Sequence, residues 1–196
     1  MAILEAIHND KAETPMKTFE IVLAIIVLMC GPAVAAELEE RAVQADGERI
    51  SLSVPKEWPA IEGHRTPAGK SYFQLGPADT NFSFQVYLNE ALPRGTNAEK
   101  RLERSLEASL KPLAEKSVEG KVELVRFGSE KEGVYARITD RAQKLGEYLY
   151  YTRGFRLIGI NVLGFELVSN DKDFLALSNT LAVIESAKIA GAKDKK

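Results

Sequence analysis

The chain has 196 residues, of which 45% are hydrophobic and 28% are charged. This composition excludes a disordered tail, a collagen and a polytopic membrane protein, and the length favours a single domain. The 26 basic and 28 acidic residues give a formal net charge of −2. We therefore expect no nucleic-acid partner, because nucleic-acid binding usually needs a clustered basic excess.

The first 36 residues have the pattern of a secretory signal. A nine-residue apolar run at 21–29 is followed by a Gly-Pro pair and then by small residues at A-x-A spacing. The run is shorter than the roughly 20 residues that a membrane span needs. We expect an exported, periplasmic protein that is cleaved near Ala35 or Ala36 and touches the membrane only through this segment before cleavage. The alternative is a retained signal that tethers the protein to the envelope.

Translation is expected to start at Met16. Residues 1–15 hold three acidic residues and one lysine, whereas a signal begins with a positive region. Cleavage also removes Cys30, the only cysteine, so the mature chain can form no disulfide. The expected organisation is a signal at 1–36, one α+β domain at 37–187 and a disordered, lysine-rich tail at 188–196.

Two hairpins are expected in the first half of the mature chain. Asp46-Gly47 separates two extended runs, and a two-residue hairpin turn needs positive φ at both positions. Pro55 should end the second strand by removing a donor. Residues 58–69 are predicted to form a loop. The four expected strands are 38–45, 48–54, 71–75 and 82–88.

Two helices are expected, each with an apolar stripe at helical spacing. The first is capped by Thr96 or Asn97 and should kink or end near Leu110, because Pro112 clashes with the preceding turn. The second begins at 169–171, where Ser, Asn and Asp supply caps. The stripes are Leu102, Leu106, Leu110 and Leu113 in the first helix, and Phe174, Leu177, Leu181 and Ile184 in the second.

Four more strands lie between the helices, at 121–127, 134–143, 147–153 and 155–165. The last has apolar residues on both faces, which is typical of a strand in the middle of a covered sheet. Asn161 in this strand should be a buried amide that bonds to protein or faces a ligand. The expected order of elements is strands, helix, strands, helix. It lacks the strand-by-strand alternation with helices that produces a parallel sheet. We predict an α+β fold with an antiparallel β-sheet sandwiched between helices.

The run Leu52-Ser53-Val54-Pro55-Lys56-Glu57-Trp58 resembles PsbP-like domains, in which an early strand ends at a proline and a tryptophan follows. Bacterial exported proteins of the DcrB-like kind are the nearer relatives, although many carry Gly where this chain has Glu57. The closing strands and the final amphipathic helix expected within 134–187 also resemble the pattern of these domains. The resemblance implies a non-catalytic binding or assembly-support role and supplies no active-site residues. Physically, Trp58 is expected to plug the end of the core.

Catalytic motifs are absent from the sequence. G-x-S-x-G, H-E-x-x-H, C-x-x-C and the glycine-rich phosphate loops do not occur. His64 is the single histidine after residue 36, and we expect it in a solvated loop. We predict that the protein is not an enzyme and binds neither a metal nor a cofactor. The alternative is a hydrolase-type enzyme whose site forms only in three dimensions.

One surface is predicted to bind a partner, either an envelope protein or a small ligand. If Arg141 lies opposite Tyr148, alternating residues of two neighbouring strands share a face. Tyr and Arg are enriched at interfaces. The alternative is that the tyrosines pack under a helix with the arginines along its rim. The residues of the predicted binding face are Arg137, Arg141, Tyr148 and Tyr150.

Overall fold

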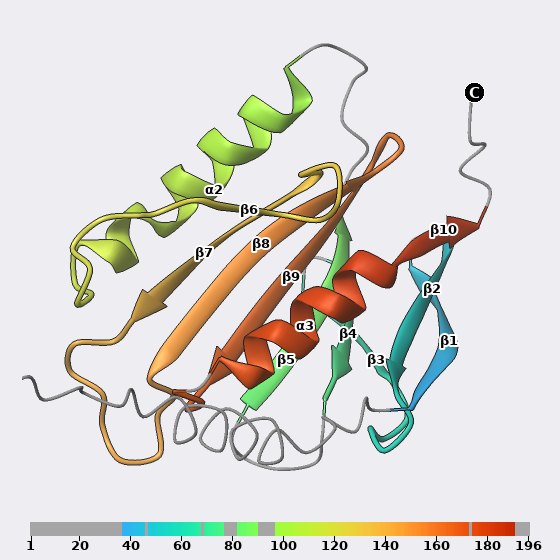
Figure 1. Ribbon diagram of the computed structural model, residues 1–196, viewed down its shortest axis with the longest axis horizontal. Coiled ribbons are helices and arrows are strands. Elements are labelled where there is room, and N and C mark those ends of the chain that lie inside the picture. The colour runs from blue at the N-terminus through green and yellow to red at the C-terminus, as the bar shows by residue number, and fades with distance from the viewer. Residues whose placement is uncertain are drawn as a thin grey trace, which may run out of the picture. The chain divides into compact units, whose positions relative to one another are not determined.

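The computed structural model (Figure 1) describes residues 37–45, 47–67, 69–76, 82–89, 97–172 and 174–190. The expected signal segment and the start at Met16 lie outside this part. No helix among the described residues is long and apolar enough to cross a membrane. In chain order the elements are β1 (Leu38–Ala45), β2 (Glu48–Pro55), β3 (Glu62–Arg65), β4 (Ser71–Leu75), β5 (Phe82–Asn89), α2 (Ala98–Ala114), β6 (Val125–Phe127), β7 (Gly133–Thr139), β8 (Tyr150–Ile158), β9 (Asn161–Ser169), α3 (Leu175–Ser186) and β10 (Lys188–Ala190).

The described strands form two antiparallel sheets. The larger has seven strands in the order β3-β4-β5-β9-β8-β7-β6, and the smaller has three in the order β1-β2-β10. Every pairing is antiparallel. This agrees with the expected α+β class, since hairpin connections rather than helical crossovers join most neighbours.

A hydrophobic cluster packs on each face of the large sheet. Neighbouring residues of β9 divide between them: Val162 lies in the cluster with α2, and Leu163 lies in the cluster with α3. Helix α2 lies against β7 and β8 (Figure 1), and its cluster includes side chains of both strands. The α3 cluster also holds the buried side of β2. Because successive side chains of a strand point to opposite faces, the helices lie on opposite faces, and the predicted sandwich is confirmed.

The first hairpin has the predicted register. Ala45 pairs with Glu48, which leaves a two-residue turn, and Gly47 has φ of 92°. Asp46 lies outside the described residues. β2 ends at Pro55 as expected. Trp58 is 5% exposed and meets the ring of Phe84 edge-on at 6.4 Å, so it plugs the core as predicted.

The single strand expected at 155–165 is divided by a turn at 159–160 and belongs to two strands, β8 and β9. β8 ends at Ile158, β9 begins at Asn161, and these two residues pair across the turn. Gly159 has φ of 63°, a conformation that glycine adopts without strain. The residues on either side of the turn, at 157–158 and 162–163, are apolar, so the apolar run continues across the turn and hides it. Asn161 is half-buried at the first position of β9, so the expectation of a buried amide was wrong.

Of the kink or end expected near Leu110, the end is excluded, because helix α2 continues past this residue. It runs to Ala114 with Pro112 inside its last turn. A proline there removes one backbone donor, and the burial of Leu110 and Ala114 outweighs that loss. Leu113, expected in the apolar stripe, is 48% exposed, and Ala114 takes the buried position.

The last helix begins later than expected, at Leu175. The backbone N–H of Ala176 donates to Asp171 Oδ2 at 2.6 Å, so one of the expected cap residues does cap it. Ser169 instead ends β9. The buried residues of α3 are Ala176, Leu177, Thr180, Val183 and Ile184.

The first three residues of the tail expected at 188–196 are ordered, because Lys188–Ala190 forms β10 and pairs with β2. Ile189 is buried, and this apolar side chain anchors the strand. Residues 191–196 lie outside the described part. The strands expected at 121–127 and 134–143 are shorter in the structure, at 125–127 and 133–139. The loop expected at 58–69 contains the short strand β3.

Candidate binding pocket on the open face of the sheet

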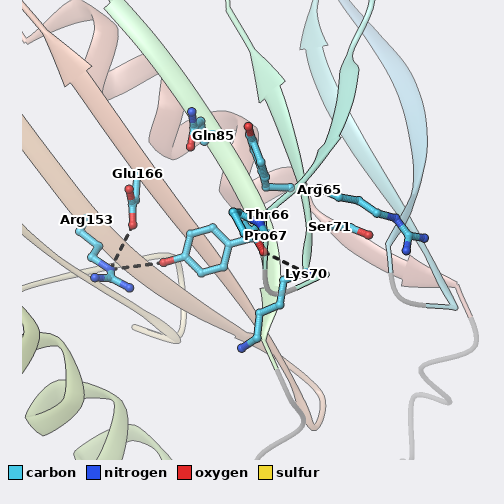
Figure 2. Close-up of a pocket in the computed structure, with 10 residues that line it drawn as sticks. Arg65, Thr66, Pro67, Lys70, Ser71, Gln85, Arg153 and Glu166 are labelled. Carbon is cyan, nitrogen blue, oxygen red and sulfur yellow. Dashed lines mark hydrogen bonds and ion pairs between the residues drawn. The ribbon is translucent and has the colours of Figure 1, made fainter.

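A pocket of about 490 Å³ lies on the large sheet (Figure 2). Helix α2 packs mainly on β7 and β8. The same face, where it continues over β5 and β4, carries the pocket. Its lining residues come from β3, β4, β5, β8, β9 and the β3–β4 turn: Arg65, Thr66, Pro67, Lys70, Ser71, Tyr72, Gln85, Tyr87, Arg153 and Glu166.

Strand register brings the floor residues together. Tyr72 pairs with Tyr87 across β4 and β5. Gln85 pairs with Glu166, which in turn pairs with Arg153. Gln85 and Tyr87 alternate with buried residues of the α3 cluster, so they point to the opposite face. Residues distant in sequence thus form two adjacent rows across the sheet.

Gly164 gives Tyr87 its position. A Cβ atom at Gly164 would lie 2.2 Å from Tyr87 Cε2, which is closer than any side chain tolerates. The missing side chain lets the tyrosine ring lie across β9, so that its hydroxyl accepts a hydrogen bond from Arg153 Nε at 3.3 Å. Tyr72 leans the other way, because its ring stacks on His64 at 5.1 Å. Tyr72 thus contacts β3 and Tyr87 contacts β9, and both tyrosines line the pocket.

The polar groups of the pocket wall are linked to one another. Arg153 Nε lies 3.5 Å from Glu166 Oε1, and the hydroxyl of Tyr151 also hydrogen-bonds to Glu166. Burial raises the pKa of Tyr87. Burial alone would lower the pKa of Arg153, but Tyr87 and Glu166 raise it above its ordinary value. At neutral pH the wall therefore presents a charged guanidinium beside a protonated tyrosine.

Lys70 stands at the mouth of the pocket on a tight turn. The backbone N–H of Thr66 donates to Lys70 O at 2.9 Å, and that of Lys70 donates to Thr66 Oγ1 at 3.1 Å. Gly69 allows this turn, with φ of 81°. In Figure 2, Arg153 lies at the left and Lys70 at the lower centre, whereas Arg65 points to the right, away from Arg153.

The predicted register of the binding face agrees with the structure. Arg137 pairs with Thr152 and Thr139 pairs with Tyr150, the alignment that sets Arg141 opposite Tyr148. The strands end before that last pair, however, and residues 140–149 form a longer connection.

The arginines of that face are held by the protein itself. The guanidinium of Arg137 lies between the rings of Tyr150 and Phe174, at 3.7 and 4.0 Å. Arg137 Nη2 donates to Asp171 O at 3.1 Å, and Arg141 Nη2 donates to the carbonyl of Ser117. Tyr148 and Tyr150 are both half-buried. The structure therefore brings Arg137 and Tyr150 together, and the binding role of the face stays a prediction.

His64 lies in β3 rather than in the expected loop. Its ring is half-buried against Tyr72 and stands 3.6 Å from Glu62. Within the described ranges there is no group of three or more His, Cys, Asp or Glu side chains that could hold a metal ion.

The pocket residues were not predicted from sequence as a site. One signal was present: Ser83, Gln85 and Tyr87 occupy the polar alternate positions of a strand whose other face is apolar. The missing information is the pairing of β5 with β9. Helix α2 and three strands separate these two strands in the chain, so no local turn fixes their register.

No protein-family model matches the chain, and no curated protein matches it. Among solved structures it is similar to cyanobacterial PsbP (CyanoP) from Synechocystis sp. PCC 6803, with a TM-score of 0.46, 13% identity, and coverage of 82% of this chain and 96% of that one. It is also similar to a protein from Bacteroides thetaiotaomicron VPI-5482, with a TM-score of 0.40, 16% identity, and coverage of 71% and 44%. The narrower DcrB-like assignment stays a prediction.

Proposed function

We propose that this protein is an exported, non-catalytic binding module that holds a small ligand in the pocket over β4 and β5. The observation that carries the proposal is a hollow of about 490 Å³ that is lined by two tyrosines, Tyr72 and Tyr87, and by the cationic side chains of Lys70 and Arg153. Concave sites with an aromatic lining and a few placed polar groups are typical of small-molecule binding.

The protonation states of the pocket favour binding over acid–base catalysis. Glu166 accepts contacts from both Arg153 and Tyr151, which hold its carboxyl group in place. The pKa of Tyr87 is raised by burial, so its proton is held more firmly. General acid–base catalysis works best with a group whose pKa lies near the working pH. These groups instead form a fixed pattern of donors and charges.

Export is the second part of the proposal. The described fold begins at Glu37, whose carbonyl accepts a hydrogen bond from the backbone N–H of Lys56 at 2.8 Å. Strand β1 begins one residue later. Cleavage near Ala35 or Ala36 would therefore leave the strand and its pairing with β2 intact.

Two matched tryptophan variants test the pocket. Gln85 lines it, whereas Gln74 is the cross-strand partner of Gln85 on the same face and does not. Thermal-shift screening of the purified protein, against small molecules of all charge classes, should yield ligands that raise the melting temperature. We expect Gln85→Trp to abolish these shifts by filling the pocket and Gln74→Trp to preserve them.

Ligands that stabilise both variants equally would place the binding site elsewhere, and a screen without ligands would remove the support for a small-molecule module. Turnover of any screened compound that Gln85→Trp abolishes would favour the hydrolase-type alternative.

A further inference from the structure

Given the proposed binding function, we infer that the pocket selects a small organic anion. Its carboxylate or phosphate group would lie between Lys70 and Arg153, and its flat, weakly polar body would lie between Tyr72 and Tyr87. Charge, donor geometry, aromatic lining and volume each support one part of this inference.

The charge of the lining is positive. Two cations, Lys70 and Arg153, and one carboxylate, Glu166, are among its described residues, and Arg65 lines it with a side chain that points away from Arg153 (Figure 2). Glu166 is 3.5 Å from Arg153 and offsets that charge. Lys70 is exposed and makes its described hydrogen bonds through backbone atoms. An anion entering the pocket therefore meets a positive potential, whereas a cation is repelled.

The donors suit an oxyanion. Arg153 uses Nε for its contacts with Tyr87 and Glu166, and the terminal nitrogens of a guanidinium carry four more N–H groups. The ammonium group of Lys70 carries three. Hydrogen bonds between such cations and a carboxylate or phosphate are roughly twice as strong as neutral ones.

The aromatic lining and the volume point to an organic ligand rather than a bare ion. The ring of Tyr72 stacks on the ring of His64, and the ring of Tyr87 lies against Gly164, which has no side chain. Flat faces of this kind favour a planar group. About 490 Å³ lies within the range of pockets that hold small organic molecules and is far larger than an inorganic anion needs.

Five related probes separate these contributions in NMR titrations of the purified protein. Benzoate and phenyl phosphate are anions with a ring, benzamide is neutral, benzamidine is cationic, and inorganic phosphate lacks the ring. We expect the two ring anions to shift amide signals of β4, β5 and β9 and to bind roughly tenfold tighter than benzamide or benzamidine. Phenyl phosphate should bind tighter than inorganic phosphate. Comparison of the two ring anions shows whether carboxylate or phosphate is preferred.

A matched pair of variants tests the role of Lys70. Lys70→Gln removes a charge at the pocket, and Lys100→Gln removes one from the exposed surface of α2. Both should keep the wild-type melting temperature. We expect Lys70→Gln to raise the dissociation constant of the better ring anion about fivefold and Lys100→Gln to leave it unchanged.

The outcomes distinguish the ligand class from the pocket itself. If benzamide or benzamidine shifts the same signals at equal affinity, the anion inference is wrong and the binding pocket stands. If inorganic phosphate binds as tightly as phenyl phosphate, the inference that the ligand has an organic body is wrong. Equal effects of the two lysine variants would overturn the role of Lys70. If every probe leaves the pocket signals unmoved, both the inference and the proposed site fail.

Discussion

At Gly164, a missing side chain determines the shape of the pocket. The ring of Tyr87 occupies the space that a Cβ atom would need, and its hydroxyl thereby reaches Arg153. The sequence showed this glycine but not what it approaches, since the approach comes from a strand paired with β9. Trp58 is the opposite case. Its position just after Pro55 predicted a buried plug from local information alone, and the structure agrees.

Gly164→Ala should therefore destabilise the protein. The methyl group forces the Tyr87 ring to move, and overpacking of this kind costs about 1–3 kcal/mol. Gly63→Ala is the control, because a Cβ there would meet Phe73 at an ordinary 3.5 Å. Urea denaturation of both variants measures the difference. Equal stabilities would contradict the close approach of Tyr87 to β9.

Tyr150→Ala measures how firmly Arg137 is held. The tyrosine ring is half-buried and covers the guanidinium of Arg137, so we expect a loss of about 1–3 kcal/mol. Leu145→Ala, at a fully exposed side chain of the β7–β8 connection, should cost well under 1 kcal/mol. If Tyr150→Ala costs as little as Leu145→Ala in thermal denaturation, the ring is free to contact a partner, as the predicted binding face requires.

Among the elements, hairpins with local turns were predictable and longer-range features were not. Asp46-Gly47 fixes the register of β1 and β2, and the polar–apolar alternation fixed which face of β5 is buried. The turn between β8 and β9 was missed because the residues on either side of it, at 157–158 and 162–163, are apolar. The strand β10 was missed because three residues form it only by pairing with β2.

Gly47→Val should destabilise the first hairpin. Gly47 has φ of 92°, and a β-branched residue in that region is strained by about 1–3 kcal/mol. Gly47→Asn is the control, since asparagine tolerates positive φ better. Calorimetry should show a clearly lower melting temperature for the valine variant than for the asparagine variant. Identical melting temperatures would argue against this turn.

Across the whole molecule, Glu132 and Arg156 join three parts of the fold. Glu132 precedes β7 and lies 3.2 Å from Arg156 of β8. Arg156 Nη1 donates to the carbonyls of Ile184 and Glu185 in the last turn of α3, at 2.7 and 2.6 Å. Burial alone would raise the pKa of Glu132, but backbone N–H groups and Arg156 outweigh it and lower the pKa.

The stability of the protein should therefore fall in acid. A carboxyl group with a lowered pKa in the folded state binds protons less readily than in the unfolded state. Its contribution is complete above the ordinary carboxyl pKa and is lost as the pH falls through the folded-state value. We expect Glu132→Gln to be less stable than wild type at pH 7 and to lose less stability towards pH 3. Glu107→Gln, on the exposed surface of α2, is the control. Denaturant midpoints across this range measure the effect, and parallel profiles for wild type and Glu132→Gln would rule it out.

The central claim is that the open face of the sheet, between Tyr72 and Tyr87, is a ligand-binding site. A crystal structure of the protein grown with phenyl phosphate tests it most directly. The account predicts the phenyl ring between the two tyrosines and the phosphate within hydrogen-bond distance of Lys70 or Arg153. A pocket filled only by water, or phenyl phosphate bound elsewhere on the molecule, would contradict it.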